Sequence, residues 1–173
     1  RRQDQGVVLD IDAPNYRSSD ELETERQPTL IALENVTNPQ NVGMTIRSVG
    51  ASPASGLLLP KRGTASLDAL VIKASAGTLF KTSIFHCEDL TVALPELKQR
   101  GYLVYGMSGR GTVAIKDVTI DKPGIYLLGN ETHGLTPEVE ALCDQLVKIP
   151  MQNQVESLNV SVAAALIAFR SVL

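Results

Sequence analysis

The stretch TLIALENVTNPQNVGMTIRSVGA, residues 29 to 51, joins an apolar run to a segment with helical periodicity. The run TLIAL, residues 29 to 33, has no polar alternation, which is typical of a strand that is covered on both faces. Further on, Val42, Ile46 and Val49 recur at the spacing of a buried helix stripe. The stretch therefore predicts a β-strand followed by an α-helix, the repeating unit of a parallel α/β fold.

The same alternation continues through the rest of the chain. Ligands in such folds bind beyond the carboxyl ends of the strands, so the loops after Leu33, Leu128 and Ile149 are the candidate binding loops. The further strand-like runs are GLLLP (56–60), TSIFH (82–86), YLVYGM (102–107), IYLLG (125–129) and QLVKIP (145–150). The expected helices are residues 41–51, 66–75, 89–100, 137–143 and 159–172.

Length and composition narrow the class of protein. The chain has 173 residues, enough for one domain with a full core, and 43% of them are hydrophobic. No apolar run approaches the roughly 20 residues that span a bilayer, so we do not expect this chain to be a membrane protein. Cys87 and Cys143 form no CxxC pair, which indicates reduced thiols and a cytoplasmic location. The net charge of −3 disfavours generic binding to phosphate backbones, so any RNA contact must be local or assisted.

The N-terminal part differs from the rest. The chain opens without Met on RRQDQGVVLDIDAP, which holds the strand-like run GVVLDI at residues 6 to 11 and no signal-peptide pattern. Residues 18 to 28, SSDELETERQP, are polar and acidic and are expected to form a linker or exposed excursion. We therefore interpret residues 1–28 as the remnant and linker of a longer protein, and residues 29–173 as the main domain.

The first candidate loop carries Asn41, Gly43 and Arg47 around the start of its helix. Asn38 or Asn41 can cap the helix. Gly43 lies one turn before Arg47, where a missing side chain would let a ligand approach the guanidinium, and a helix N-terminus beside an arginine suits a phosphate. A plain capped helix with a solvated arginine remains an equal alternative on this stretch alone.

The second loop, in IYLLGNETHGLTPEVE at residues 125 to 140, runs from a strand into Gly129-Asn130-Glu131 and on to Gly134. It lacks the Lys-Ser/Thr pair of a phosphate-binding P-loop, and the chain has no GxGxxG, which disfavours nucleoside triphosphates and ordinary dinucleotides. His133 and His86 have no partners at metal-ligand spacing and are interpreted as ordinary loop and structural residues.

The third loop, in KIPMQNQVESLNVSVAAALIAF at residues 148 to 169, delivers Ser157 and Asn159 to a helix that is apolar nearly all round. We expect this helix to be buried, with Ala163 to Ala165 allowing close packing on the chain itself or on a second subunit. Ser157 or Asn159 could be a simple cap, but Ser161 adds a third polar residue within one turn, which exceeds what capping needs.

Taken together, three stretches resemble the three motifs of the SpoU family, the ribosomal and transfer RNA ribose 2′-O-methyltransferases of the SPOUT superfamily. The stretches are NPQNVGMTIRSVGA (38–51), LLGNETHGLTPE (127–138) and IPMQNQVESLNVSVAAA (149–165). KASAG (73–77) resembles a segment between the first two motifs, and QGVV (5–8) resembles the junction after an N-terminal RNA-binding domain. Asn153 and Gln154 stand where many members have a glycine and a small residue.

The resemblance implies a parallel-sheet α/β fold with a deep C-terminal trefoil knot, residues 29–173 as the catalytic domain, and S-adenosylmethionine as cofactor without a metal. Arg47 is then expected to bind phosphate and stabilise the alkoxide, or to act as a base in a special environment. The implied functional positions are Arg47, Asn41, Glu131, Ser157 and Asn159. The implied cofactor contacts are Gly129, Ile149 and Leu158, with Leu128, Asn130 and Met151 beside them.

The resemblance also implies partners and leaves alternatives open. We expect a homodimer that methylates a ribose 2′-hydroxyl in RNA, with ribosomal RNA favoured over transfer RNA. A non-catalytic knotted module for RNA binding or dimerisation is one alternative. A different nucleotide-binding α/β enzyme is another, disfavoured by the missing phosphate motifs.

Overall fold

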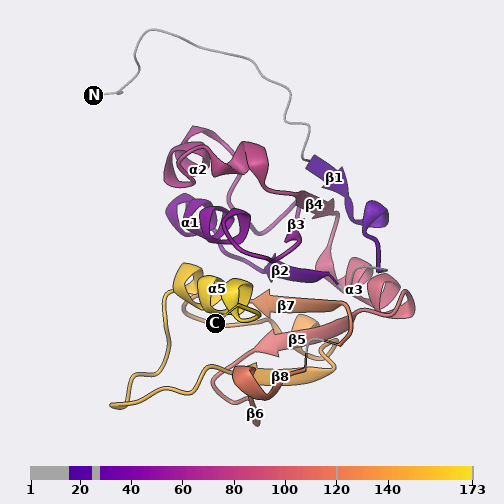
Figure 1. Ribbon diagram of the computed structural model, residues 1–173, viewed down its shortest axis with the longest axis vertical. Coiled ribbons are helices and arrows are strands. Elements are labelled where there is room, and N and C mark those ends of the chain that lie inside the picture. Colours follow the sequence, from indigo (N-terminus) through magenta and orange to yellow (C-terminus); the bar gives the residue numbers. More distant parts are fainter. Residues whose placement is uncertain (1–15, 25–27, 120, 173) are drawn as a thin grey trace, which may run out of the picture.

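The computed structural model describes residues 16–24, 28–119 and 121–172, which form a wholly parallel eight-stranded sheet flanked by helices (Figure 1). The strand order is β1-β4-β3-β2-β7-β5-β8-β6. The strands are β1 (Tyr16–Ser18), β2 (Thr29–Leu33), β3 (Gly56–Pro60), β4 (Ile84–Cys87), β5 (Leu103–Met107), β6 (Val113–Ala114), β7 (Gly124–Leu128) and β8 (Gln145–Lys148). The α-helices are α1 (Pro39–Gly50), α2 (Ala69–Ala74), α3 (Leu90–Gln99), α4 (Pro137–Glu140) and α5 (Val160–Phe169). Short 3-10 turns are η1 (Ser19–Glu21), η2 (Thr78–Lys81) and η3 (Ile115–Asp117).

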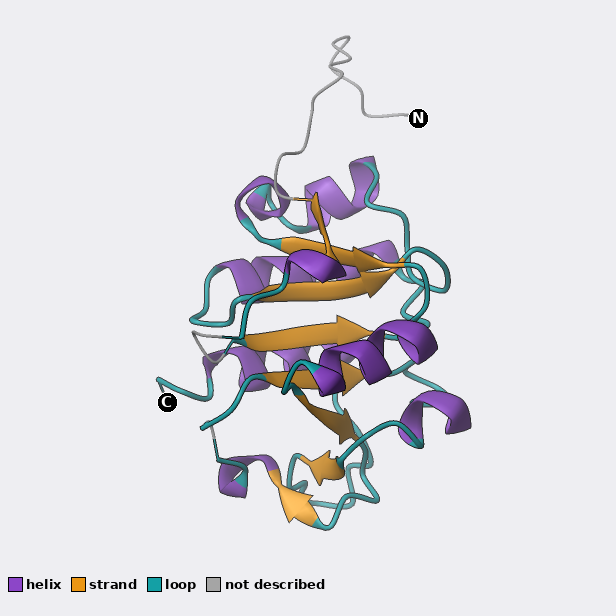
Figure 2. Cartoon of the chain, turned by 90° about the vertical axis from the view of Figure 1, so that its right-hand side faces the viewer, coloured by secondary structure: helices purple, strands orange, loops and turns teal. Residues whose placement is uncertain are grey.

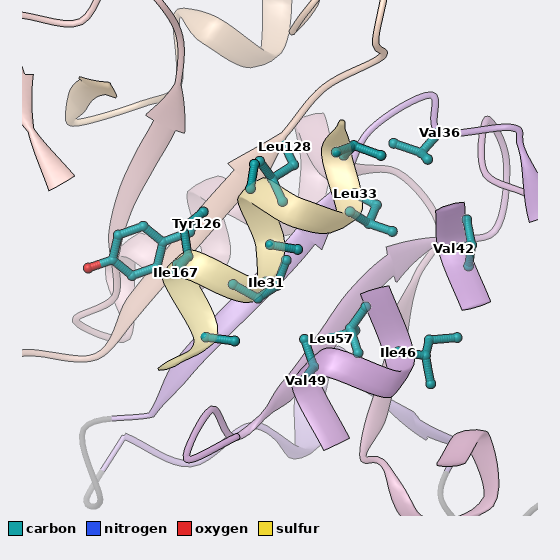
Figure 3. Close-up of a cluster of buried hydrophobic side chains, with 14 of the residues drawn as sticks. Ile31, Leu33, Val36, Val42, Ile46, Val49, Leu57, Tyr126, Leu128 and Ile167 are labelled. Atoms are coloured by element: carbon teal, nitrogen blue, oxygen red, sulfur yellow. The ribbon is translucent and has the colours of Figure 1, made fainter. Parts of the chain in front are cut away.

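Helices cover both faces of the sheet, as Figure 2 shows. Strand β2 illustrates the consequence, because Ile31 and Leu33 point into a core shared with α1, α2 and α5, while Leu30 and Ala32 point into a core shared with α3 and α4. Figure 3 shows the first of these cores, in which Ile167 of α5 lies beside Ile31. Burial on both faces explains why the strand runs lack polar alternation.

The six strands and five helices expected from the sequence are all present, with boundaries that differ by a few residues. The helix expected at residues 66–75 is shorter, because Asp68 caps it and its first turn begins at Ala69. The helix expected at 137–143 is the single turn α4. Two short strands, β1 and β6, were not predicted, since three and two residues carry too little periodicity to be seen.

The segment expected to be a linker is partly built into the domain. β1 pairs with β4 at the sheet edge, and Ser19 and Leu22 are buried. The Arg100 guanidinium donates hydrogen bonds to the carbonyls of Ser19 and Leu22, and the Tyr102 hydroxyl donates to that of Glu23 over 2.9 Å. Residues 18 to 23 are thus attached to the domain through Ser19 and Leu22, although the other four are exposed, and the run GVVLDI lies outside the described residues.

The expectation that the last helix is buried holds for one side of the helix in the single chain. Helix α5 packs on α1 and the sheet through one side, which includes Ala164 and Ile167, both with no exposed surface. Its other side leaves Val162 and Leu166 exposed by 45% and 40%. Across the described ranges, no helix has the length and apolar character needed to cross a membrane.

Candidate active site

The three candidate loops meet at one edge of the sheet because β2 and β7 are neighbours and β5 separates β7 from β8. The second and third of these loops line much of an open cleft of about 630 Å³, and none of the described residues in its lining comes from the first loop. Every cofactor position implied by the sequence lines this cleft, together with Glu131 and Ser157 of the functional set. Those cofactor positions are Leu128, Gly129, Asn130, Ile149, Met151 and Leu158.

Asn41 joins the three loops through its side-chain amide. Its Nδ2 donates a hydrogen bond to Oε1 of Glu131 in the loop after β7. Its Oδ1 accepts a hydrogen bond of 3.1 Å from Nδ2 of Asn159 at the start of α5. Asn41 is only half-exposed, whereas Glu131 and Asn159 are exposed.

Asn159 serves both as a helix cap and as a link to Asn41. Its Oδ1 accepts hydrogen bonds from the backbone N–H of Ser161 over 2.9 Å and from the Ser161 hydroxyl over 2.6 Å. Because Ser161 is buried, this pair fixes the orientation of the Asn159 amide and turns its Nδ2 toward Asn41. The cap and functional interpretations of Asn159 are therefore compatible. Ser157 is not the cap of α5, and it lies on the cleft wall.

The loop after β7 folds back on itself as a short hairpin. The backbone groups of Asn130 and Gly134 exchange hydrogen bonds of 3.0 and 2.8 Å. A Cβ on Gly129 would lie 2.2 Å from the backbone carbon of Gly134, so only glycine allows this closure. Gly134 itself has a φ of +72°, which also favours glycine. The two glycines that the sequence singles out thus shape the cleft wall.

Gly43 of the first loop has a different role from the predicted one of admitting a ligand beside Arg47. A Cβ on Gly43 would lie 2.4 Å from Cβ of Ala74 and 2.8 Å from the carbonyl oxygen of Val71, both in α2. Gly43 is buried, so it allows α1 to pack against α2 and makes no room for a ligand. The cap of α1 is Asn38, whose Oδ1 accepts from the Gln40 N–H over 2.9 Å.

Arg47 stands apart from the cleft. Its side chain is exposed on α1, it is absent from the cleft lining, and it makes no hydrogen bond or ion pair with any residue in the described part of the chain. A separation of six residues from Asn41 corresponds to roughly 9 Å along the helix axis and a different side of the helix. The single chain therefore brings together four of the five predicted functional residues and leaves Arg47 outside.

The cleft also contains residues that the sequence interpretation missed. The loop after β5 contributes Met107 to Arg110, and the Arg110 guanidinium forms an ion pair of 2.6 Å with Glu140, which also lines the cleft. The rule that ligands bind at the carboxyl ends of strands applies equally to β5, and the SGRG sequence that follows is a loop signal. His133, interpreted as an ordinary loop residue, also lines the cleft.

The charge in the cleft is mainly negative. Its lining contains three carboxylates, those of Glu131, Glu140 and Glu156, and Arg110 is the one Lys or Arg side chain in that lining. No group of three or more His, Cys, Asp or Glu side chains within the described ranges could hold a metal ion. Neither thiol is activated as a nucleophile, because burial raises the pKa of Cys87 to about 12 and that of Cys143 to about 11.

The comparison with known families agrees with this geometry. The model of the SpoU rRNA Methylase family matches residues 28–169, which include all three loops and the whole cleft. The chain belongs to the SpoU rRNA methylase family. An uncharacterised tRNA/rRNA methyltransferase of Mycobacterium ulcerans is 36% identical over 167 residues, which cover 94% of this chain and 54% of that protein. This SpoU chain thus spans about half the length of such relatives.

Solved structures place the SpoU chain among SPOUT methyltransferases with the same parallel-sheet α/β fold. An AdoMet-bound rRNA methyltransferase from Sinorhizobium meliloti is 27% identical, with a TM-score of 0.80 over 90% of this chain and 60% of that one. An RNA 2′-O ribose methyltransferase is 25% identical, with a TM-score of 0.76 over 87% of this chain and 58% of that one.

Proposed function

We propose that this chain is the catalytic domain of an S-adenosylmethionine-dependent RNA methyltransferase that acts on a ribose 2′-hydroxyl. The observation that carries the proposal is the hydrogen-bonded set of Glu131, Asn41 and Asn159, which joins three sequence motifs beside one cleft. Membership in the SpoU family and the likeness to an RNA 2′-O ribose methyltransferase support the same conclusion.

The residues of the cleft fit the proposed cofactor chemically. A volume of about 630 Å³ is within the usual range for sites that hold small molecules. Leu128, Ile149 and Leu158 offer apolar surface for an adenine ring. The carboxylates of Glu131 and Glu140 suit a ligand that carries a sulfonium and an ammonium group. Bound S-adenosylmethionine would supply the methyl group.

The side chains around the cleft would position the ribose. Methyl transfer forms a bond between the 2′-oxygen and the methyl carbon, breaks the sulfonium bond to that carbon and releases the hydroxyl proton. Glu131 and the amides of Asn41 and Asn159 can accept from and donate to sugar hydroxyls, so we assign them to alignment of the 2′-oxygen. Ser157 supplies a further hydroxyl on the cleft wall.

We further propose a homodimer in which Arg47 of one copy serves the cleft of the other. Arg47 does not line the cleft of its own chain, so a role in catalysis requires another source of proximity. Helices α1 and α5 lie side by side in Figure 1 and expose Met44, Val162 and Leu166, each by 40% or more. This apolar surface is suited to a second copy. The guanidinium would then bind a phosphate and stabilise the developing alkoxide.

Two finer features complete the proposal. We favour ribosomal over transfer RNA as the substrate, in keeping with the family model, and transfer RNA is the second candidate.

We also propose that the segment from Ile149 to the end of α5 forms the trefoil knot of the superfamily. Its loop runs from β8 back to α5, which packs against α1, β2 and β7 (Figure 1).

Calorimetry and a methyl-transfer assay test the proposal together. The protein should bind S-adenosylmethionine, transfer its labelled methyl group to RNA, and yield 2′-O-methylnucleosides on digestion of that RNA. Sedimentation at micromolar concentration should show a dimer. Absence of cofactor binding would contradict the enzymatic assignment, a label found on a base would contradict the ribose target, and a strictly monomeric species would contradict the shared site.

A further inference from the structure

The first residue of the first candidate loop carries a buried carboxylate. Glu34 directly follows β2, is 6% exposed, and is the only charged side chain among the buried residues of the described ranges. Its Oε1 accepts a hydrogen bond of 2.6 Å from the Thr136 hydroxyl, and its Oε2 accepts one of 3.0 Å from the Thr136 N–H. No described Lys or Arg forms an ion pair with it. Both carboxylate oxygens are thus directed at one residue of another loop.

Thr136 lies where the cleft hairpin ends. The hairpin leaves β7 at Leu128, turns through residues 129–135, and reaches Thr136, which caps the single turn α4. The backbone N–H of Glu34 donates a hydrogen bond of 2.9 Å to the carbonyl of Leu128, at the other end of the same hairpin. Glu34 therefore holds both ends of the hairpin, one through its backbone and one through its carboxylate.

A neighbouring contact strengthens this connection. Nδ2 of Asn130 donates a hydrogen bond of 3.1 Å to the carbonyl of Asn35, the residue after Glu34. Oδ1 of Asn130 accepts from the N–H groups of Thr132 and His133 within the hairpin. The hairpin that carries Gly129, Asn130 and Glu131 is thus anchored to residues 34 and 35 at its beginning, its interior and its end.

Burying a carboxylate without a cation costs free energy unless hydrogen bonds compensate for lost water. Both hydrogen bonds of the Glu34 carboxylate come from Thr136. The contact between Glu34 and Thr136 therefore depends on one relative position of the two loops. We propose that Glu34 is a positioning residue for the cofactor cleft, which fixes the hairpin from Gly129 to Leu135 through Thr136. This inference rests on the proposed function of the cleft.

Four variants separate positioning from a general loss of stability. Glu34→Ala leaves both donors of Thr136 without their partner, whereas in Glu34→Gln the amide oxygen can accept from the N–H and the amide nitrogen can donate to the hydroxyl oxygen. Thr136→Val keeps the backbone N–H and replaces by a methyl group the hydroxyl that bonds Glu34 and caps α4. Thr82→Val is the matched control, because Thr82 is 3% exposed and its hydroxyl bonds the Thr78 carbonyl over 2.9 Å, outside the cleft lining.

Two measurements are made on each folded variant: cofactor affinity by calorimetry, and amide hydrogen exchange of residues 129–135 without cofactor. We expect Glu34→Ala and Thr136→Val to exchange these amides faster and to lose about tenfold or more in affinity for S-adenosylmethionine, a factor equivalent to about 1.4 kcal/mol. Glu34→Gln and Thr82→Val should resemble the unaltered protein in both. If Glu34→Ala does not fold, Thr136→Val and Glu34→Gln still decide.

Two results would overturn the inference. One is unchanged exchange and affinity in Thr136→Val. The other is an equal effect of Thr82→Val on the hairpin, which would attribute the loss to stability alone. If the unaltered protein binds no S-adenosylmethionine, the proposed function fails, and the hydrogen-exchange comparison alone then decides whether Glu34 positions the hairpin.

Discussion

The side-chain amide of Asn159 donates a hydrogen bond of 3.1 Å to Oδ1 of Asn41, which is 118 positions earlier in the chain. This contact exists because Asn159 is held as the cap of α5 by Ser161, while Asn41 lies in the first turn of α1 and the two helices pack side by side. Asn41 then passes the connection to Glu131. One hydrogen-bonded set thus links the three motifs of the family.

Asn159→Asp should separate the two roles of this residue. Aspartate caps a helix as well as asparagine and is favoured by the helix dipole, so the free energy of unfolding should change by no more than about 0.5 kcal/mol. The variant lacks the Nδ2 donor to Asn41, so methyl transfer should fall by about tenfold or more. Asn159→Ala should lose turnover and also about 1 kcal/mol of stability. Urea unfolding and the labelled-methyl assay measure both, and full activity in the Asp variant would contradict the role of the Asn41 contact.

Arg47→Ala should preserve folding and cofactor affinity, with a stability change within about 0.5 kcal/mol, because the exposed side chain makes no hydrogen bond or ion pair with any described residue. Turnover should fall by on the order of 10² or more, the usual scale for loss of one electrostatic stabiliser of the transition state. Arg47→Lys should restore little, because the ammonium lacks the planar fork of the guanidinium. Turnover on RNA, with melting temperature measured alongside, checks this expectation.

Mixing inactive variants should show which subunit supplies Arg47. Arg47→Ala and Glu131→Ala are each expected to be inactive, but subunit exchange between them creates dimers in which one cleft has Glu131 from one copy and Arg47 from the other. Activity should therefore reappear on mixing. No recovery, despite confirmed exchange of subunits, would place Arg47 in its own chain's site.

Gln154→Gly should stabilise the third loop. Asn153 and Gln154 have φ angles of +54° and +59°, and the Val155 N–H donates to the Gln152 carbonyl over 3.1 Å, which defines a tight turn with two left-handed residues. Glycine relieves the Cβ strain at this position at some cost in chain entropy, so we expect a gain of about 0.5 to 1 kcal/mol. Gln152→Gly, outside the left-handed region, is the control and should give no gain. Melting temperature measures both variants.

Stability should fall as the pH rises above about 9. Burial raises the pKa of Cys87 from 9.0 to about 12, that of Cys143 from 9.0 to about 11 and that of Tyr126 from 10.0 to about 12. Between the ordinary and the raised values, the unfolded chain releases protons that the folded chain retains, which favours unfolding. Urea midpoints measured from pH 8 to 11 should decline, and Cys87→Ala should flatten that decline. A midpoint that rises with pH would contradict the assignment.

The local pattern of apolar residues predicted most of the strands and helices for a physical reason. A strand such as β7, buried on both faces, must be apolar throughout, and a helix such as α1 must carry a regular apolar stripe. The edge strand β1 escaped prediction because its three residues are polar or half-exposed and gain their position from pairing with β4. The contacts of Arg100 and Tyr102 with the segment before β2 were not predicted either, because they join residues far apart in the sequence.

The sequence by itself determined the parallel α/β class and the three loops at the carboxyl edge, and its motifs singled out residues that line the cleft, because period, loop chemistry and motif order are local properties of the sequence. Only the tertiary structure decided what each polar residue contacts. It assigned Gly43 to helix packing against Ala74, joined Asn41 to Asn159, and buried Glu34 against Thr136. These outcomes depend on which surfaces meet when distant segments pack, and residue spacing along one chain segment carries no record of that.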